Sequence, residues 1–157
     1  MIIGVIGGEQ ATPEEEQLAY EVGREIGRRG HVLVCGGRGG VMRAACRGAR
    51  EAGGHTIGIL PGEDASDANE YVEFPIITGI GFARNAIIAR TAEALVAIGG
   101  RYGTLSEIAF AFIAGRPVAG LRTWQLTTPD GEAVPIVPCE TPEEAVDFCE
   151  RLARRKD

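Results

Sequence analysis

The chain of 157 residues is expected to form one domain, spanning residues 1–157, because about 100–200 residues is the usual size of a domain. Its 45% hydrophobic and 24% charged residues are typical of a globular protein and exclude a disordered or low-complexity chain. The net charge of −6 disfavours nucleic acids and anionic membranes as partners, since both would repel the protein.

The first residues lack the pattern of a secretory signal. Residues 1–6 are apolar, but no basic region precedes them and a glycine pair ends the run. No stretch approaches the ~18 consecutive apolar residues of a membrane span, so we expect a cytoplasmic protein. The four cysteines have neither CxxC spacing nor a neighbouring histidine, which predicts reduced, mostly buried thiols and no metal site.

Short apolar runs alternate with helical patterns along the chain, which indicates a parallel sheet wrapped by helices. The predicted strands cover residues 2–6, 32–35, 55–60, 72–78, 94–98, 117–121 and 136–138. The predicted helices run from residue 13 to Gly30, over residues 41–52, 82–92 and 104–114, and onward from residue 141. Together they predict a Rossmann-like, doubly wound α/β domain with six to seven mostly parallel strands and helices on both faces.

Three of these helices have distinctive faces or ends. The first and the last begin with the Thr-Pro-Glu-Glu pattern of a capping box, at Thr12 and Thr141. The helix over residues 41–52 has a face of small residues, and we expect it to lie very close to the sheet. The helix over residues 104–114 is apolar almost all round, so it is either deeply buried or half in a subunit interface. We favour the interface, and therefore a homodimer or a larger homo-oligomer.

Four of the predicted strands end in glycine-rich turns, at residues 7–8, 36–40, 79–81 and 99–103. Because the carboxyl ends of parallel strands share one edge of the sheet, these turns converge on one crevice. Glycines let backbone amides approach a ligand, and the helix that follows each turn presents unpaired N–H groups. The pattern predicts a phosphate site, with residues 7–10 at its border. The alternative is that these glycines only make tight turns.

Three common phosphate or cofactor motifs do not fit. In a dinucleotide fingerprint starting at Gly37, Met42 would occupy the third glycine position, and the next strand ends in Leu60 and Pro61 rather than an acidic residue. A P-loop needs a lysine that is missing here. Lys156 is the only lysine among 16 basic residues, which nearly excludes a Schiff base with pyridoxal phosphate.

Two long motifs, each at a strand-to-helix turn, resemble those of a known family. Residues 36–42, Gly-Gly-Arg-Gly-Gly-Val-Met, resemble the GGxxGxM signature of the Lonely Guy (LOG) superfamily, whose members are often mislabelled lysine decarboxylases. Residues 99–107 are similar to its second signature, PGGxGTxxE. In the hydrolase branch, the resemblance implies cleavage of the N-glycosidic bond of a nucleoside 5′-monophosphate, with catalytic roles for Arg84 and Glu107.

The sequence departs from that hydrolase pattern. Gly99 replaces the motif proline, Arg101 replaces its second glycine, and Asn85 replaces the basic residue that usually follows the arginine. Residues 81–85 and the end of the second motif look more like the branch of the molybdenum cofactor carrier proteins, which bind a phosphorylated pterin without cleaving it.

We therefore expect a binding protein for a phosphorylated nucleotide-like or pterin ligand, with no required cofactor and the molybdenum cofactor as its cargo. The alternative is a phosphoribohydrolase that acts on nucleoside 5′-monophosphates. Both use one site, whose predicted ligand-binding residues are Gly7, Gly8, Gly36, Gly37, Arg38, Gly39, Gly40, Val41, Met42, Arg84, Asn85, Gly99, Gly100, Arg101, Gly103 and Thr104.

Several of these residues also have a purely structural interpretation. Thr104 and Glu107 have capping-box spacing, so Glu107 either caps a helix or acts in the site. Arg84 stands near a helix start, where a cation opposes the dipole, so it meets an anion or Glu107, or it is solvated. Arg38 and Arg101 either bind a phosphate or face solvent. Met42 is expected to pack under its turn.

Overall fold

The computed structural model describes residues 1–153, so Lys156, on which the exclusion of pyridoxal phosphate rests, lies outside the described residues. The strands are β1 Ile2–Gly7, β2 Val32–Cys35, β3 His55–Leu60, β4 Phe74–Ile77, β5 Ala94–Ile98, β6 Val118–Leu121 and β7 Ile136–Pro138. The helices are α1 Pro13–Arg28, α2 Val41–Glu51, α3 Asn85–Thr91, α4 Tyr102–Ile113 and α5 Pro142–Ala153, and a 3-10 turn, Gly81–Arg84, precedes α3.

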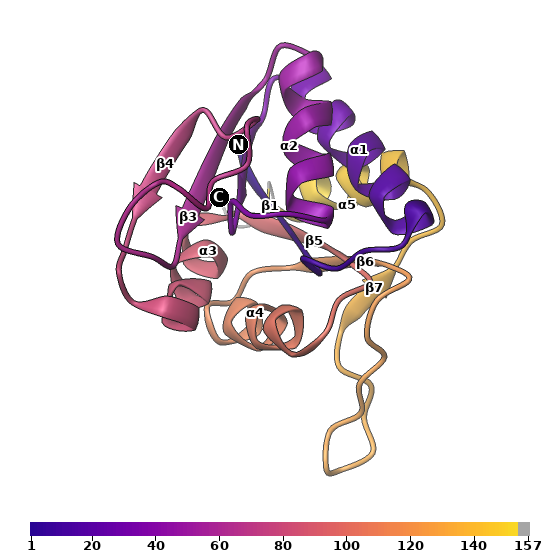
Figure 1. Cartoon of the computed structure of the whole chain (residues 1–157). Helices are drawn as coiled ribbons and strands as arrows, with labels where there is room; N and C mark the ends of the chain where they lie inside the picture. Colours follow the sequence, from indigo (N-terminus) through magenta and orange to yellow (C-terminus); the bar gives the residue numbers. More distant parts are fainter. Residues whose placement is uncertain (154–157) are drawn as a thin grey trace.

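The seven strands form one sheet in the order β4-β3-β2-β1-β5-β6-β7, and all six neighbouring pairs are parallel. Helices α1, α2 and α5 cover one face, and α3 and α4 cover the other (Figure 1). Each face has its own apolar core. The inner strands therefore carry side chains into two packed layers, which explains the nearly continuous burial of β1, β2, β5 and β6. The predicted Rossmann-like α/β fold is confirmed.

The small face of α2 packs against α1, a partner that its sequence does not indicate, while α2 also contacts β1, β2 and β3. That α2 lies very close to the sheet stays a prediction. A Cβ on Gly48 would stand 2.0 Å from the Tyr20 carbonyl oxygen, and a Cβ on Gly23 would stand 1.9 Å from that of Ala45. The two helix backbones therefore touch where glycines replace side chains. Any larger residue at these positions would force the helices apart.

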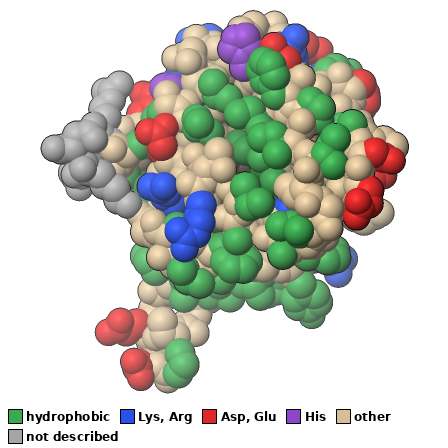
Figure 2. Space-filling view, turned by 90° about the vertical axis from the view of Figure 1, so that its left-hand side faces the viewer, with side chains coloured by type: hydrophobic (Ala, Val, Ile, Leu, Met, Phe, Trp, Pro, Cys, Tyr) green, Lys and Arg blue, Asp and Glu red, His purple; other side chains and the backbone are tan. Residues whose placement is uncertain are grey.

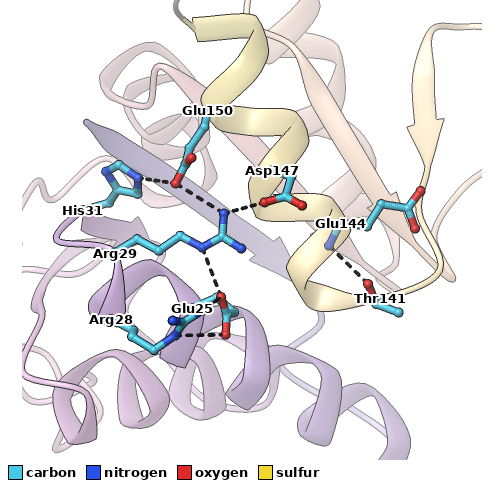
Figure 3. A network of polar contacts seen from close by, with 8 residues as sticks. All are labelled: Glu25, Arg28, Arg29, His31, Thr141, Glu144, Asp147 and Glu150. Carbon is cyan, nitrogen blue, oxygen red and sulfur yellow. Dashed lines mark hydrogen bonds and ion pairs between the residues drawn. The ribbon is translucent and has the colours of Figure 1, made fainter.

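A polar network joins α1 to α5 at the edge of the sheet opposite the glycine turns (Figure 3). Arg29 binds both the buried Glu25, at 3.0 Å, and Asp147, at 2.6 Å, and Glu150 accepts from Arg29 and pairs with His31. Burial raises the pKa of Glu25 but its two arginine partners outweigh this and hold it below its usual value. His31 thus helps to hold α5 in place.

The outer strand β4 and helix α4 leave apolar side chains exposed. All four β4 residues are exposed, and hydrophobic side chains gather on that side of the molecule (Figure 2). On α4, Ile108 is buried whereas Ile113 is 72% exposed, which excludes the deeply buried alternative for this helix. The subunit interface stays a prediction. No helix within residues 1–153 is both long and apolar enough to cross a membrane.

Two elements differ from their predicted bounds. The predicted helix over residues 82–92 is divided into the 3-10 turn and α3, because Gly81, with φ of 63°, turns the chain before Arg84. The strand predicted over residues 72–78 shortens to β4, since Thr78 instead bonds to the Leu60 carbonyl through both its amide and its hydroxyl.

Candidate functional site

A cavity of about 240 Å³ opens at the carboxyl ends of β1, β2 and β5, where the order of the sheet reverses direction around β1. In doubly wound folds such a switch point holds the ligand, because the neighbouring connections leave on opposite faces. The cavity is lined by Gly7, Gly8, Glu9, Gln10, Arg38, Met42, Phe82, Arg84, Asn85, Arg101, Gly103, Thr104 and Glu107. Residues 7–10 thus lie at this cavity, where the sequence placed them.

Arg84 lies in the wall of the cavity, 5% exposed, at the end of the 3-10 turn. Its Nε donates to the Ile59 carbonyl at 2.9 Å, its Nη2 to the Gly36 carbonyl at 3.4 Å, and its Nη1 to Oδ1 of Asn85. Burial lowers the pKa of the guanidinium, and the neighbouring Glu107 opposes this shift. A guanidinium stays protonated in proteins, so Arg84 keeps its charge. It has five N–H donors, and the three bonds above leave two for another partner.

Asn85 connects Arg84 to the first turn of α4. Its Nδ2 donates to Ser106 Oγ at 3.0 Å, and that hydroxyl donates to the Gly103 carbonyl at 2.6 Å. The amide fits this chain because it accepts from Arg84 on one side and donates on the other. A basic residue at position 85 could not accept the Arg84 bond.

Glu107 is 7% exposed and does not cap α4, so the capping-box interpretation is wrong. Helix α4 already begins at Tyr102, which places Thr104 inside it, and no side chain caps its first turn. By contrast, the hydroxyls of Thr12 and Thr141 both accept N-cap bonds of 3.1 Å.

Burial raises the pKa of Glu107 to about 8, although the charge of Arg84 partly opposes this. Within residues 1–153, no hydrogen bond or ion pair engages the Glu107 carboxyl group. Near neutral pH this side chain is therefore mostly the uncharged acid.

Of the first motif, residues 36–42, only Arg38 in the glycine turn and Met42 in α2 line the cavity. The amides of this motif serve the fold instead: Gly37 N–H donates to Cys35 Sγ at 3.3 Å, and Val41 N–H donates to the Gly8 carbonyl at 3.0 Å. The structure therefore does not bring five of the predicted residues to the cavity, namely Gly36, Gly37, Gly39, Gly40 and Val41. Gly36 still matters, because a Cβ there would stand 2.8 Å from both Arg84 Nη2 and Met42 Sδ.

The second glycine turn faces two cavities. Arg101, Gly103 and Thr104 line the smaller one, whereas Gly99, Gly100, Arg101 and Tyr102 line a neighbouring cavity of about 680 Å³. The first internal bond of α4 runs from Leu105 N–H to the Arg101 carbonyl. The amides of residues 102–104 therefore have no acceptor inside the helix and can bind an anion.

The smaller cavity carries a positive charge. Arg38, Arg84 and Arg101 line it, and Arg38 pairs with Glu9 at 3.2 Å. With Glu107 uncharged, three guanidinium groups face one ionised carboxylate. Within residues 1–153, no cluster of three or more His, Cys, Asp or Glu side chains could hold a metal ion. Its excess of arginines over ionised carboxylates lets the cavity attract an anion.

The sequence reasoning missed the aromatic residues of both cavities. Phe82 lies at the smaller cavity and is 76% exposed, and Tyr102 and Trp124 line the larger one. The useful signal was an aromatic residue directly beside a glycine turn, as at Gly81-Phe82 and Arg101-Tyr102. Trp124 carried no such signal, because only the fold brings residues 122–124 to this edge.

Comparison with known families places this site in context. A family model for the SLOG cluster4 family matches residues 1–146. The chain belongs to the SLOG cluster4 family. Among relatives of this SLOG protein, an uncharacterised protein of Archaeoglobus fulgidus is 44% identical over 149 residues, which cover 95% of this chain and 94% of that one.

Two further comparisons carry functional names. The molybdenum cofactor binding protein of Rippkaea orientalis has a TM-score of 0.86 and 34% identity to the SLOG chain, over 96% of both chains. A cytokinin riboside 5′-monophosphate phosphoribohydrolase of Mycobacterium tuberculosis is 33% identical over 121 residues, which cover 69% of this chain but only 63% of that protein. The resemblance to the LOG superfamily is thus confirmed.

Proposed function

We propose that this SLOG protein binds and carries a phosphorylated pterin, with the molybdenum cofactor as its cargo. The observation that carries the proposal is the state of Glu107: it is buried beside Arg84 with a pKa raised to about 8 by burial. The cavity therefore attracts an anion while lacking an ionised carboxylate at the position where a hydrolase would need one.

The phosphate would bind at the first turn of α4. The amides of residues 102–104 lack acceptors within the helix, and Arg101 and the two remaining N–H donors of Arg84 lie at the same cavity. Hydrogen bonds from charged donors and from a helix terminus are the usual means of holding a phosphate. The likeness to the molybdenum cofactor binding protein of Rippkaea orientalis, over 96% of both chains, supports the proposal.

The second candidate is a nucleoside 5′-monophosphate phosphoribohydrolase, favoured by the presence of Arg84 and Glu107 at one cavity. In that reaction a carboxylate would stabilise the oxocarbenium-like transition state or activate water. The uncharged acid can do neither. Any hydrolysis should therefore increase as the pH rises toward and above about 8, where Glu107 ionises.

The test uses the wild-type chain and Glu107→Gln, which keeps the shape of the uncharged acid. For a carrier, both proteins should retain molybdopterin, released anaerobically from a molybdoenzyme, through gel filtration at pH 7. Neither should release adenine from AMP. Adenine release by the wild type that disappears in Glu107→Gln would establish the hydrolase instead, and failure of the wild type to retain molybdopterin would refute the carrier.

A further inference from the structure

Two aromatic side chains line the larger cavity beside the candidate site. It shares Gln10 and Arg101 with the smaller cavity, so the two spaces adjoin along these residues. Of these two cavities, only the larger one is lined by Tyr102 and Trp124, whose ring centroids lie 6.2 Å apart with planes at 38°. One ligand can therefore reach both cavities by passing Gln10 and Arg101.

Size argues that a ring-bearing ligand must use both spaces. Sites for small molecules usually measure about 300–1,000 Å³. The smaller cavity, at about 240 Å³, is below this range, and the larger one, at about 680 Å³, is well within it. A phosphate fits the first space, whereas a phosphate attached to a fused ring system does not.

The aromatic side chains are positioned to receive a flat ring. Trp124 is held in place because its indole N–H donates to the Arg101 carbonyl at 3.1 Å. Tyr102 is 80% exposed, and no hydrogen bond engages its hydroxyl within residues 1–153. A planar heterocycle stacked on these rings would cover apolar surface that the fold leaves in water.

The charged residues also favour the phosphate in the smaller cavity and the ring in the larger one. The phosphate is favoured in the smaller cavity, where three arginines face Glu9 and the uncharged Glu107. In the larger cavity Arg122 is already paired with Glu14 at 2.5 Å, and Glu15 stands against Gly99. The larger space is thus closer to neutral, as suits a heterocycle rather than a phosphate.

We infer that the phosphate of the ligand occupies the smaller cavity while its ring system lies in the larger one against Tyr102 and Trp124. This inference rests on the proposed function and narrows it. The ligand class is a phosphorylated planar heterocycle, and a phosphate ester without a planar heterocycle binds at one of the two cavities only.

The test exploits Trp124, the single tryptophan of the chain. Affinities for AMP, neopterin monophosphate and ribose 5-phosphate are measured by calorimetry, and Trp124 fluorescence is followed with AMP and with ribose 5-phosphate. Both ring ligands should bind at least about fivefold more tightly than ribose 5-phosphate, because stacking one base adds about 1–3 kcal/mol. AMP should quench Trp124, and ribose 5-phosphate should leave its emission unchanged.

Three variants locate the ring. Tyr102→Ala should weaken the ring ligands about tenfold and leave ribose 5-phosphate unchanged, whereas Tyr102→Phe should retain the wild-type affinities. Phe74→Ala, which removes an exposed ring from β4 rather than from either cavity, is the matched control and should change nothing.

Each failure has a distinct meaning. If AMP binds without changing Trp124 fluorescence, or if Tyr102→Ala weakens all three ligands equally, the inference is overturned. Retention of molybdopterin in the earlier experiment would then leave the carrier proposal standing. If molybdopterin and all three ligands fail to bind, both proposals fall.

Discussion

The two glycine-rich turns have similar sequences but use their glycines in opposite ways. In the turn over residues 36–40, glycines allow the backbone to pack on other backbone, and amides of this turn and of Val41 donate to Cys35 and Gly8. In the turn over residues 99–103, glycines line two cavities and lead into a helix whose first amides have no acceptor inside the helix. A glycine motif at a strand end therefore indicates either close packing or a ligand site, and only the partners of its amides distinguish them.

The loop over residues 63–70 explains why the first turn faces inward. Asn69 from this loop donates through Nδ2 to the carbonyls of Gly37 and Arg38, at 3.3 and 2.9 Å, and its amide also donates to Gly37. Carbonyls of the second turn are also held, since Thr123 donates to Gly99 at 2.7 Å and Trp124 to Arg101 at 3.1 Å. The difference lies in the amides, because those of residues 102–104 have no acceptor inside α4. We therefore expect substitutions at the first turn to cost stability and substitutions at the second to cost binding.

The largest expected effect is at Gly40. Its φ of 61° and ψ of −126° suit glycine alone, and a Cβ would stand 2.3 Å from the Gly8 carbonyl oxygen and 2.4 Å from that of Glu9. Gly40→Ala should lower the free energy of unfolding by about 3 kcal/mol or more, as measured by urea denaturation.

Gly103→Ala is the matched variant on the second turn. The nearest atom to a Cβ there is Asn85 Nδ2, at 4.0 Å, so stability should stay equal or rise by up to about 1 kcal/mol. The new methyl group would narrow the smaller cavity and weaken binding of ribose 5-phosphate. Equal losses of stability in the two variants would refute the distinction between the turns.

An intermediate effect is expected at Asn69. Asn69→Ala removes the bonds to Gly37 and Arg38, and also the bond that Asn69 Oδ1 accepts from Tyr71 N–H. Leaving these half-buried groups unpaired should cost about 1–3 kcal/mol of unfolding free energy. Asp67→Ala, an exposed change in the same loop, should alter the unfolding free energy by no more than about 0.5 kcal/mol. A loss similar to that of Asn69→Ala would show that the loop as a whole, rather than the bonds from Asn69, stabilises the turn.

The remaining prediction concerns the pH dependence of stability, and it centres on Glu107, in the helix that follows the second turn. Its pKa is about 8 in the folded protein and near 4.5 when unfolded, so the folded state binds the extra proton between these values. Stability should therefore fall as pH rises from about 5 to 8, by up to about 1.4 kcal/mol per pH unit, and level off above. Urea denaturation of Glu107→Gln should lack this component. Parallel pH profiles for the two proteins would contradict the assignment.

The sequence predicted the sheet and its order of elements well, because these depend on local patterns. Alternation of apolar runs with helical patterns reports burial on both faces of a strand. The Thr12 and Thr141 caps need only residues three positions apart. The glycine turns could be assigned to one edge because parallel strands end together.

The errors concern distant partners. The small face of α2 predicted close packing correctly but not its partner, since nothing in residues 41–52 encodes the glycines of α1. Glu107 has capping-box spacing, yet α4 begins two residues before Thr104, so the same spacing falls inside the helix. Asn69, which binds the first turn, and Trp124, which lines the larger cavity, lie on loops that only the fold brings to this edge of the sheet.

The close contact between α1 and α2 also bears on how the chain folds. Gly23 and Gly48 touch backbone only about 20–30 residues away along the chain, whereas β1 pairs with β5 across about 90 residues. Ends that are near in sequence meet with a smaller loss of chain entropy, so residues 2–51 should form the folding nucleus. Substitutions in the α1–α2 contact should then slow refolding, while those in β6 and β7 should mainly accelerate unfolding.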